Sequence, residues 1–320
     1  MSNMVGLLQS RWEIVRTPEA PDTIRYKCTT PFVTMTPAET ILTHQNLQRV
    51  VRRAISDETT EKVILDLDNC AKCDPGGLLL LRHAGEQLRT AGRLGYVTHS
   101  EPSDSFDTII ENQRHLWERT AAKKGNVKTT DSSPAVESPQ DGKYLLRSIE
   151  NRNEMVQEIG EWAEIVKKGA DAAPEDVACW EMQIAEVATN TFQHGRSEQI
   201  WVSGHFYKQS GVVQLAAIDY GATIPAVIRD EAQRQGRLGT DSDLIAFACE
   251  LGVTSRCVRQ NQGSGLVSLI QSVGINGGRM QILSRNGFFH VNKTRKYRKT
   301  PPGASLSLHG TLIILCLKVR

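Results

Sequence analysis

The chain has 320 residues, of which 39% are hydrophobic and 23% are charged, and its formal net charge is +2. This length allows two domains of ordinary size, and the composition is that of a globular protein. The near-neutral balance gives no general reason to expect nucleic acid or an anionic membrane as a partner. No apolar run approaches the roughly 18 residues that a membrane helix needs, and residues 1–10 lack the pattern of a signal peptide. Seven cysteines without framework spacing predict a cytoplasmic protein rather than a disulfide scaffold.

The first half of the chain has the pattern of an α/β domain. Residues 1–30 give weak signals and are left as an N-terminal segment of uncertain structure, so the domain is predicted to span residues 31–120. Strands alternating with helices favour a mainly parallel sheet. Residues 121–143 are small, polar and proline-containing, and we interpret them as a linker. The individual elements predicted here are strands at 63–67 and 94–97 and helices at 78–88 and 105–119.

The second half, residues 144–320, predicts a two-layer α/β domain with a mostly antiparallel sheet. Helices are expected near 145–168 and 175–194, and a third is expected from Gly263 to about residue 274. The stretch from about 226 to 262 is interpreted as a lid over a ligand. The predicted strands are residues 199–206, 212–219, 279–284, 287–292 and 310–317.

The most informative motif is the run E-V-A-T-N-T-F-Q-H-G at residues 186–195. Glu186, Asn190 and His194 recur every four residues, so a helix would place all three side chains on one stripe. A carboxylate, an amide and an imidazole on one face form a plausible site for a hydrated metal ion and a phosphate chain.

Three further motifs are compatible with a nucleotide. Asp219 ends an apolar strand, where its carboxylate can accept a hydrogen bond from an adenine amino group, and Gly221 lets a ligand lie against the backbone. Gly263 and Gly265 open a helix, whose amide N–H groups and dipole favour an anion. The fourth motif is the pair Gly310-Thr311 at the start of the last strand.

Together these motifs resemble the GHKL (histidine kinase-like, Bergerat-type) ATP-binding domain, over roughly residues 145–320, and the local text is most similar to the anti-sigma-factor serine kinases. The resemblance implies ATP and Mg²⁺ as cofactors. It implies that Asn190 binds the magnesium ion and that Glu186 is the catalytic base. It further implies cofactor-binding roles for His194, Asp219, Gly221, Gly263, Gly265 and Thr311.

Two positions depart from the pattern of that family. Thr223 stands where many members have a second glycine, and Val267 stands where the glycine-rich loop has its last glycine. Both add bulk near the expected nucleotide, which favours ATP binding over rapid turnover.

The text V-I-L-D-L-D-N-C-A-K-C-D-P-G-G-L-L-L-L at residues 63–81 resembles a STAS domain, the fold of the anti-sigma-factor antagonists. Phosphorylatable members carry a serine where this chain has Gly76. Glycine has no hydroxyl, so the domain is interpreted as a fixed docking or dimerisation module for a protein partner.

Three other features of the sequence are interpreted as ordinary structural residues rather than as functional sites. Cys70 and Cys73 form a single C-x-x-C pair, which we interpret as ordinary thiols rather than a zinc or redox site. His83 lies in a predicted helix of the STAS-like domain and is not interpreted as a phosphoacceptor. The run from Lys293 to Lys299 holds five cations, which could touch nucleic acid, but a solvated loop is favoured.

The sequence therefore leaves two main functions open, besides a third possibility, nucleic-acid binding through residues 293–299. The first is a cytoplasmic ATP-binding regulator with ATPase or protein-serine kinase chemistry. The second is a non-catalytic module in which ATP switches the binding of a protein partner through the STAS-like domain. A homodimer is compatible with both functions, and neither requires a membrane.

Overall fold

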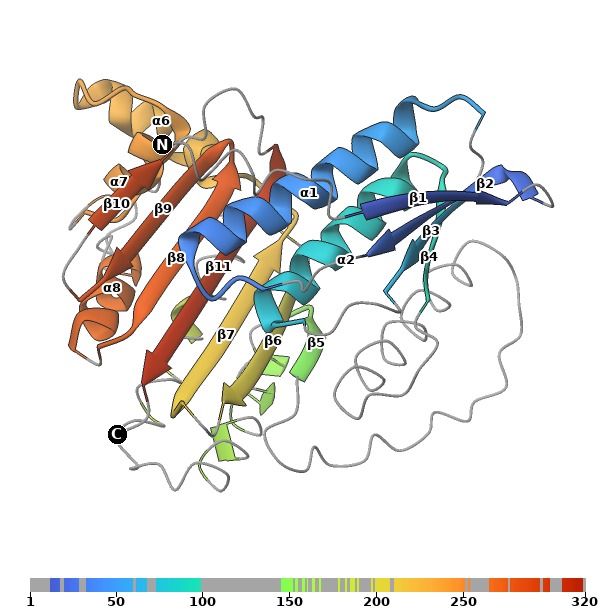
Figure 1. The fold of residues 1–320 in the computed structure, drawn as a ribbon. Coiled ribbons are helices and arrows are strands. Elements are labelled where there is room, and N and C mark those ends of the chain that lie inside the picture. The colour runs from blue at the N-terminus through green and yellow to red at the C-terminus, as the bar shows by residue number, and fades with distance from the viewer. Residues whose placement is uncertain are drawn as a thin grey trace, which may run out of the picture. The chain divides into compact units, whose positions relative to one another are not determined.

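The computed structural model describes residues 12–17, 20–28, 33–59, 62–67, 73–98, 145–151, 200–207, 210–250, 253, 265–275, 277–293, 296–299 and 307–318, with further single residues and short runs between 153 and 199. The chain divides into two compact units (Figure 1). The first comprises Met1–Thr34 and Ala38–Ser138, and the second comprises Met35–Pro37 and Pro139–Arg320. The helix predicted at 105–119 and the linker predicted at 121–143 lie outside the described residues.

The first unit contains a four-stranded sheet in the order β1-β2-β3-β4. Strands β2, β3 and β4 pair in parallel, as the alternation of strands and helices predicted, and β1 pairs with β2 in the antiparallel sense. Residues 1–30, left without assigned structure from the sequence, supply β1 and β2. The four strands are β1 (Trp12–Thr17), β2 (Ala20–Cys28), β3 (Lys62–Asp66) and β4 (Leu94–Thr98).

Two helices, α1 (Pro37–Ser56) and α2 (Pro75–Thr90), form the crossovers between the parallel strands. Each connects neighbouring strands, so right-handed crossovers place both helices on the same face of the sheet. Successive side chains of β2 point to opposite faces of the sheet. Ile24 and Tyr26 are buried on one face, while Arg25 and Lys27 on the other face are half-buried.

A buried carboxylate ties together the loops that precede these two helices. Asp74 is the N-cap of α2 and accepts a hydrogen bond from the backbone N–H of Gly77 at 2.8 Å. The same carboxylate accepts from the backbone N–H and the hydroxyl of Thr34, at 2.5 and 2.9 Å. Gly76 therefore lies in the first turn of a helix whose start is anchored to the β2–α1 loop.

The second unit contains a seven-stranded sheet in the order β10-β9-β8-β11-β7-β6-β5. Every pairing in it is antiparallel, so the mostly antiparallel sheet predicted for this half is confirmed. The strands are β5 (Leu145–Ile149), β6 (Ile200–Tyr207), β7 (Val212–Asp219), β8 (Arg279–Arg285), β9 (Gly287–Asn292), β10 (Lys296–Lys299) and β11 (Leu308–Lys318).

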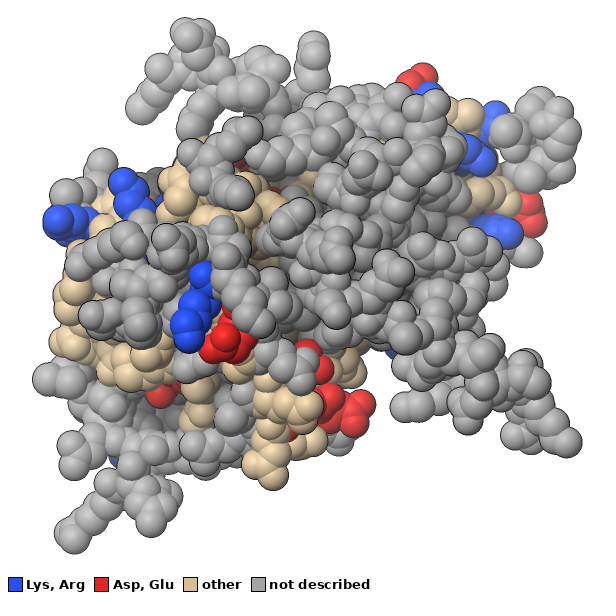
Figure 2. Space-filling view, turned by 90° about the horizontal axis from the view of Figure 1, so that it is seen from below, with Lys and Arg blue, Asp and Glu red and all other residues tan. Residues whose placement is uncertain are grey.

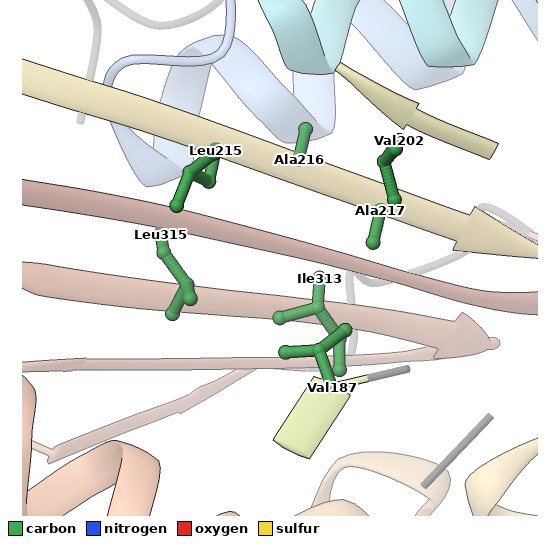
Figure 3. Close-up of a pocket in the computed structure, with 7 residues that line it drawn as sticks. All are labelled: Val187, Val202, Leu215, Ala216, Ala217, Ile313 and Leu315. Atoms are coloured by element: carbon green, nitrogen blue, oxygen red, sulfur yellow. The ribbon is translucent and has the colours of Figure 1, made fainter. Parts of the chain in front are cut away.

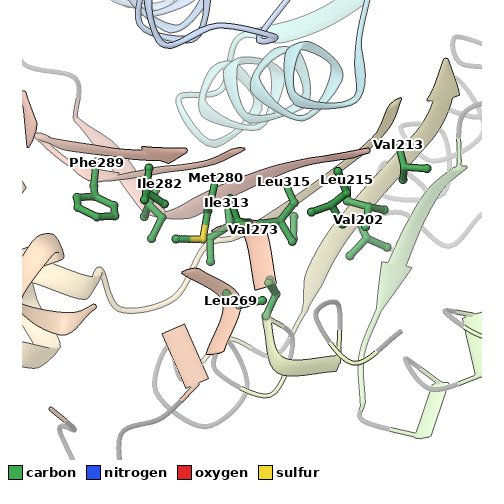
Figure 4. Packing of buried hydrophobic residues seen from close by; sticks show 14 of the residues in the cluster. Val202, Val213, Leu215, Leu269, Val273, Met280, Ile282, Phe289, Ile313 and Leu315 are labelled. Carbon is green, nitrogen blue, oxygen red and sulfur yellow. The ribbon is translucent and has the colours of Figure 1, made fainter. Parts of the chain in front are cut away.

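One face of this sheet builds the hydrophobic core with helices. Side chains such as Leu215, Met280 and Ile313 alternate toward this face, where they meet Leu269 and Val273 of helix α8 (Gly265–Ile275) (Figure 4). Val187, on a helical segment that precedes β6, belongs to the same cluster. The second unit is therefore a sheet with helices packed against this face.

Helices α6 (Ile224–Arg234) and α7 (Asp241–Ala248) occupy much of the stretch predicted as a lid. Ile228, Leu244 and Phe247 form a buried cluster between the two helices. The start of α7 is also hydrogen-bonded to the β8–β9 turn and the start of β9. Asp241 accepts a hydrogen bond from the N–H of Asn286 at 3.2 Å, and Ser242 accepts one from the N–H of Phe288 at 3.0 Å. Residues 224–250 thus pack onto the sheet, whereas residues 251–262 of the stretch predicted as a lid lie, apart from Val253, outside the described residues, so the lid stays a prediction.

Two other predicted elements differ from the structure. Residues 145–149, predicted to begin a helix, form the edge strand β5, which pairs with β6. The helix starts later because Asn151 accepts hydrogen bonds from the N–H groups of Asn153 and Glu154, both at 3.0 Å, which is the arrangement of a helix N-cap. Residues 296–299, expected in a solvated loop, form β10, which pairs with β9.

Candidate functional site

Three of the polar groups at the end of the core face lie side by side. The register pairs Thr311 of β11 with Asp219 of β7 on one side and with Ser284 of β8 on the other. Directly opposed residues of antiparallel strands hold their Cβ atoms about 4.5–5.5 Å apart. We call Asp219, Thr311 and Ser284 the polar row. The next row toward the centre of the face, Ala217, Ile313 and Ile282, is entirely apolar.

The polar row is buried, with exposed fractions of 4% for Asp219, 6% for Thr311 and 0% for Ser284. Burying polar groups costs free energy unless they are hydrogen-bonded, so their partners determine what the row can do. The Asp219 carboxylate accepts from the N–H of Gly221 at 2.9 Å, which bends the chain back after β7. The structure therefore brings together Asp219, Gly221 and Thr311, three of the residues predicted to bind the nucleotide.

Ser284 was not predicted as a site residue, and its hydroxyl makes three polar contacts. Its hydroxyl accepts from the N–H of Ile224 at 3.0 Å and donates to the carbonyl of Gly310 at 3.0 Å. Its oxygen also lies 2.9 Å from the hydroxyl oxygen of Thr311. Ser284 of β8 thus links Gly310 and Thr311 of β11 to Ile224 at the start of α6. No local pattern identifies this role, because it depends on the pairing of β8 with β11.

Gly310 allows the last strand to approach Asp219 closely. The register of β11 with β8 shifts between Leu308 and Thr311, and Gly310 has a φ of +95°. A Cβ atom at this position would lie 1.9 Å from the carbonyl oxygen of Asp219. Only glycine tolerates both the backbone conformation and this contact.

Thr223, which stands where many members of the resembled family have glycine, has a structural task here. Its side chain accepts from the N–H of Ala226 at 3.4 Å and is the N-cap of α6. The hydroxyl thus starts the helix that Ser284 contacts. This use accounts for a threonine at the position.

Glu186, the predicted base, is half-buried on a helical segment over the core face. Its neighbour Val187 lines an apolar cavity of about 30 Å³ together with Ala217 and Ile313 (Figure 3). Ala217 lies two residues before Asp219 on β7, and Ile313 lies two residues after Thr311 on β11. Each is therefore about 7 Å from the polar row along its strand. The cavity is lined only by apolar residues, so it is a packing space beside the polar row and not a place for a phosphate chain.

Helix α8 begins at Gly265, one of the two glycines predicted to meet an anion. The end of α8 is tied to the residue before β8, because the N–H of Gly278 donates to the carbonyl of Val273 at 2.9 Å. The N–H groups at the start of α8 are the positive end of its dipole.

Three of the predicted site residues, Asn190, His194 and Gly263, lie outside the described residues. Their roles stay predictions. Among the residues that the structure does describe, no group of three or more His, Cys, Asp or Glu side chains is arranged to hold a metal ion.

The basic run from Lys293 to Lys299 contributes the edge strand β10. Charged residues are common on the edge strands of sheets, where they discourage pairing with another chain. In Figure 2, some of the coloured Lys and Arg side chains lie beside an Asp or Glu side chain, and others have none next to them in this view. Nucleic-acid binding through this run stays a prediction.

The comparisons with known proteins identify no relative, since no protein family and no curated protein sequence matches this chain. Within the described part of the chain, none of the helices combines the length and the apolar character that crossing a lipid bilayer demands.

Gly310→Ala tests the close approach of β11 to Asp219. We expect a loss of about 2 kcal/mol or more in the free energy of unfolding, because the substitution adds backbone strain to a collision with a carbonyl group. Chemical denaturation measures this loss. Gly236→Ala is the matched control, because Gly236 also has a positive φ (+65°) but has no atom within 4 Å of an added Cβ. Equal losses in the two variants would contradict the close approach.

Proposed function

We propose that this chain is an ATP-binding regulatory protein whose second unit is a GHKL-type domain and whose first unit is a STAS-like module. The observation that supports the proposal most is the polar row. An acidic side chain at the end of β7 stands beside Thr311, and the glycine turn at Gly221 follows it. An ionised carboxylate is a hydrogen-bond acceptor only, which suits the exocyclic amino group of adenine.

The phosphate chain would extend from this row toward the start of α8. Backbone N–H groups at a helix start, opened by Gly265, favour an anion. Asn190 would hold Mg²⁺, which neutralises charge on the phosphates. Glu186 would accept a proton from water or from a serine hydroxyl, giving ATP hydrolysis or phosphotransfer to a protein.

The alternative is a non-catalytic switch, in which ATP binding changes how the first unit holds a protein partner. Gly76 favours it, because the first turn of α2 offers no hydroxyl at the position that is phosphorylated in STAS-type antagonists. Val267, in the first turn of α8, adds a side chain where the resembled family has glycine. Both alternatives share the nucleotide site and differ in turnover.

Calorimetric titration with ATP and magnesium tests the site. Asp219→Ala should weaken ATP binding at least about tenfold, because a hydrogen bond to a charged group contributes about 1.5–3 kcal/mol. Asp230→Ala, which removes an exposed carboxylate from α6, is the matched control and should bind ATP like the wild type. Wild-type protein that binds no ATP, or equal affinities in wild type and Asp219→Ala, would refute the proposed site.

Glu186→Ala separates the enzyme from the switch. If Glu186 is the base, phosphate release or labelling of a partner should fall by about 100-fold or more while ATP binding is retained. Incubation with ATP labelled at the γ-phosphate measures both. Turnover that survives in the variant would reject the role of Glu186, and wild-type protein that binds ATP without any turnover would favour the switch over the enzyme.

A further inference from the structure

The hydroxyl of Ser284 has one proton and two lone pairs, and the structure accounts for all three. The proton goes to the carbonyl of Gly310, and one lone pair accepts from the N–H of Ile224. The remaining contact, 2.9 Å to the oxygen of Thr311, is then satisfied by the second lone pair. Thr311 must therefore donate its own proton to Ser284.

The backbone explains why Ser284 gives its proton to Gly310 rather than to Thr311. The register of β11 with β8 skips residues 309 and 310, so the regular pairing does not include the carbonyl of Gly310. Gly310 is also buried. A buried carbonyl without a donor costs free energy, and Ser284, with no exposed surface of its own, supplies that donor.

Once its proton is committed, the Thr311 hydroxyl can only accept hydrogen bonds from a ligand. Asp219, directly opposite Thr311, is likewise an acceptor when ionised. We infer that Ser284 is a specificity-determining positioning residue, which fixes the proton of Thr311 so that the polar row accepts a 6-amino purine and rejects a 6-oxo purine. This inference rests on the proposed function, because it assigns the selectivity of the same site.

The experiment compares ATP with inosine triphosphate, which carries a carbonyl in place of the amino group, by calorimetric titration of the full chain. Wild-type protein should prefer ATP. In Ser284→Ala the Thr311 hydroxyl is free to rotate and to donate to the carbonyl, so the preference for ATP should fall about tenfold, the value of roughly one hydrogen bond, mainly through tighter inosine triphosphate binding. A merely structural role for Ser284 would weaken both nucleotides alike.

An unchanged ratio of the two affinities in Ser284→Ala, with ATP still bound by the wild type, would overturn the inference and leave the proposed function standing. Absence of ATP binding in the wild type would overturn both. Circular dichroism establishes whether Ser284→Ala folds.

If Ser284→Ala does not fold, Thr311→Val and Thr311→Ser replace it. Removing the hydroxyl in Thr311→Val should lower the affinity for ATP and leave that for inosine triphosphate unchanged, while Thr311→Ser should keep the wild-type ratio. Equal losses of both nucleotides in Thr311→Val would overturn the inference.

Discussion

The antiparallel pairing of β7, β11 and β8 is the constraint from which the candidate site follows. This register places Asp219, Thr311 and Ser284 on neighbouring strands in one row, at the edge of a face whose other rows are apolar. Shifting any of these strands by one residue would turn its polar side chain to the opposite face of the sheet. The hydrophobic core that fixes the register therefore also fixes the geometry of the polar groups.

The polar row also links the ends of several elements. Gly310 lets β11 come close to the carbonyl of Asp219, and Ser284 connects β8 to the first residue of α6, Ile224. At the start of α7, Asp241 and Ser242 accept hydrogen bonds from the N–H groups of Asn286 and Phe288. The starts of helices α6 and α7 are thus hydrogen-bonded to β8, to β9 and to the turn between them.

Much of the second unit could be predicted from the sequence because its strands carry strong local patterns. The bounds predicted for β7 and β9 agree with the structure, and α8 starts within two residues of the prediction. Strand β2 was not predicted, although its residues Ile24, Tyr26 and Cys28 alternate with polar residues. Two further strands were not predicted: β5, where the cap formed by Asn151 sets the start of the helix, and β10, whose charged residues are held by pairing with β9.

Only part of the candidate site was predicted, because a single sequence shows local patterns and not long-range contacts. Asp219 ends an apolar strand, and Gly221 follows it by two residues. Thr311 comes directly after a glycine near the start of the last apolar strand. Each of these positions can therefore be recognised in the local sequence. Ser284 does not stand out, because its importance comes from partners at positions 224, 310 and 311 that only the folded sheet brings to it. Long-range pairing of this kind leaves no periodic signal in a single sequence.

A crystal structure of the chain with magnesium and a non-hydrolysable ATP analogue would locate the adenine base relative to the polar row. We expect the amino group of the base to lie within hydrogen-bonding distance of the Asp219 carboxylate, beside Thr311 and Ser284. A nucleotide bound elsewhere, or a base with its amino group turned away from this row, would contradict this expectation.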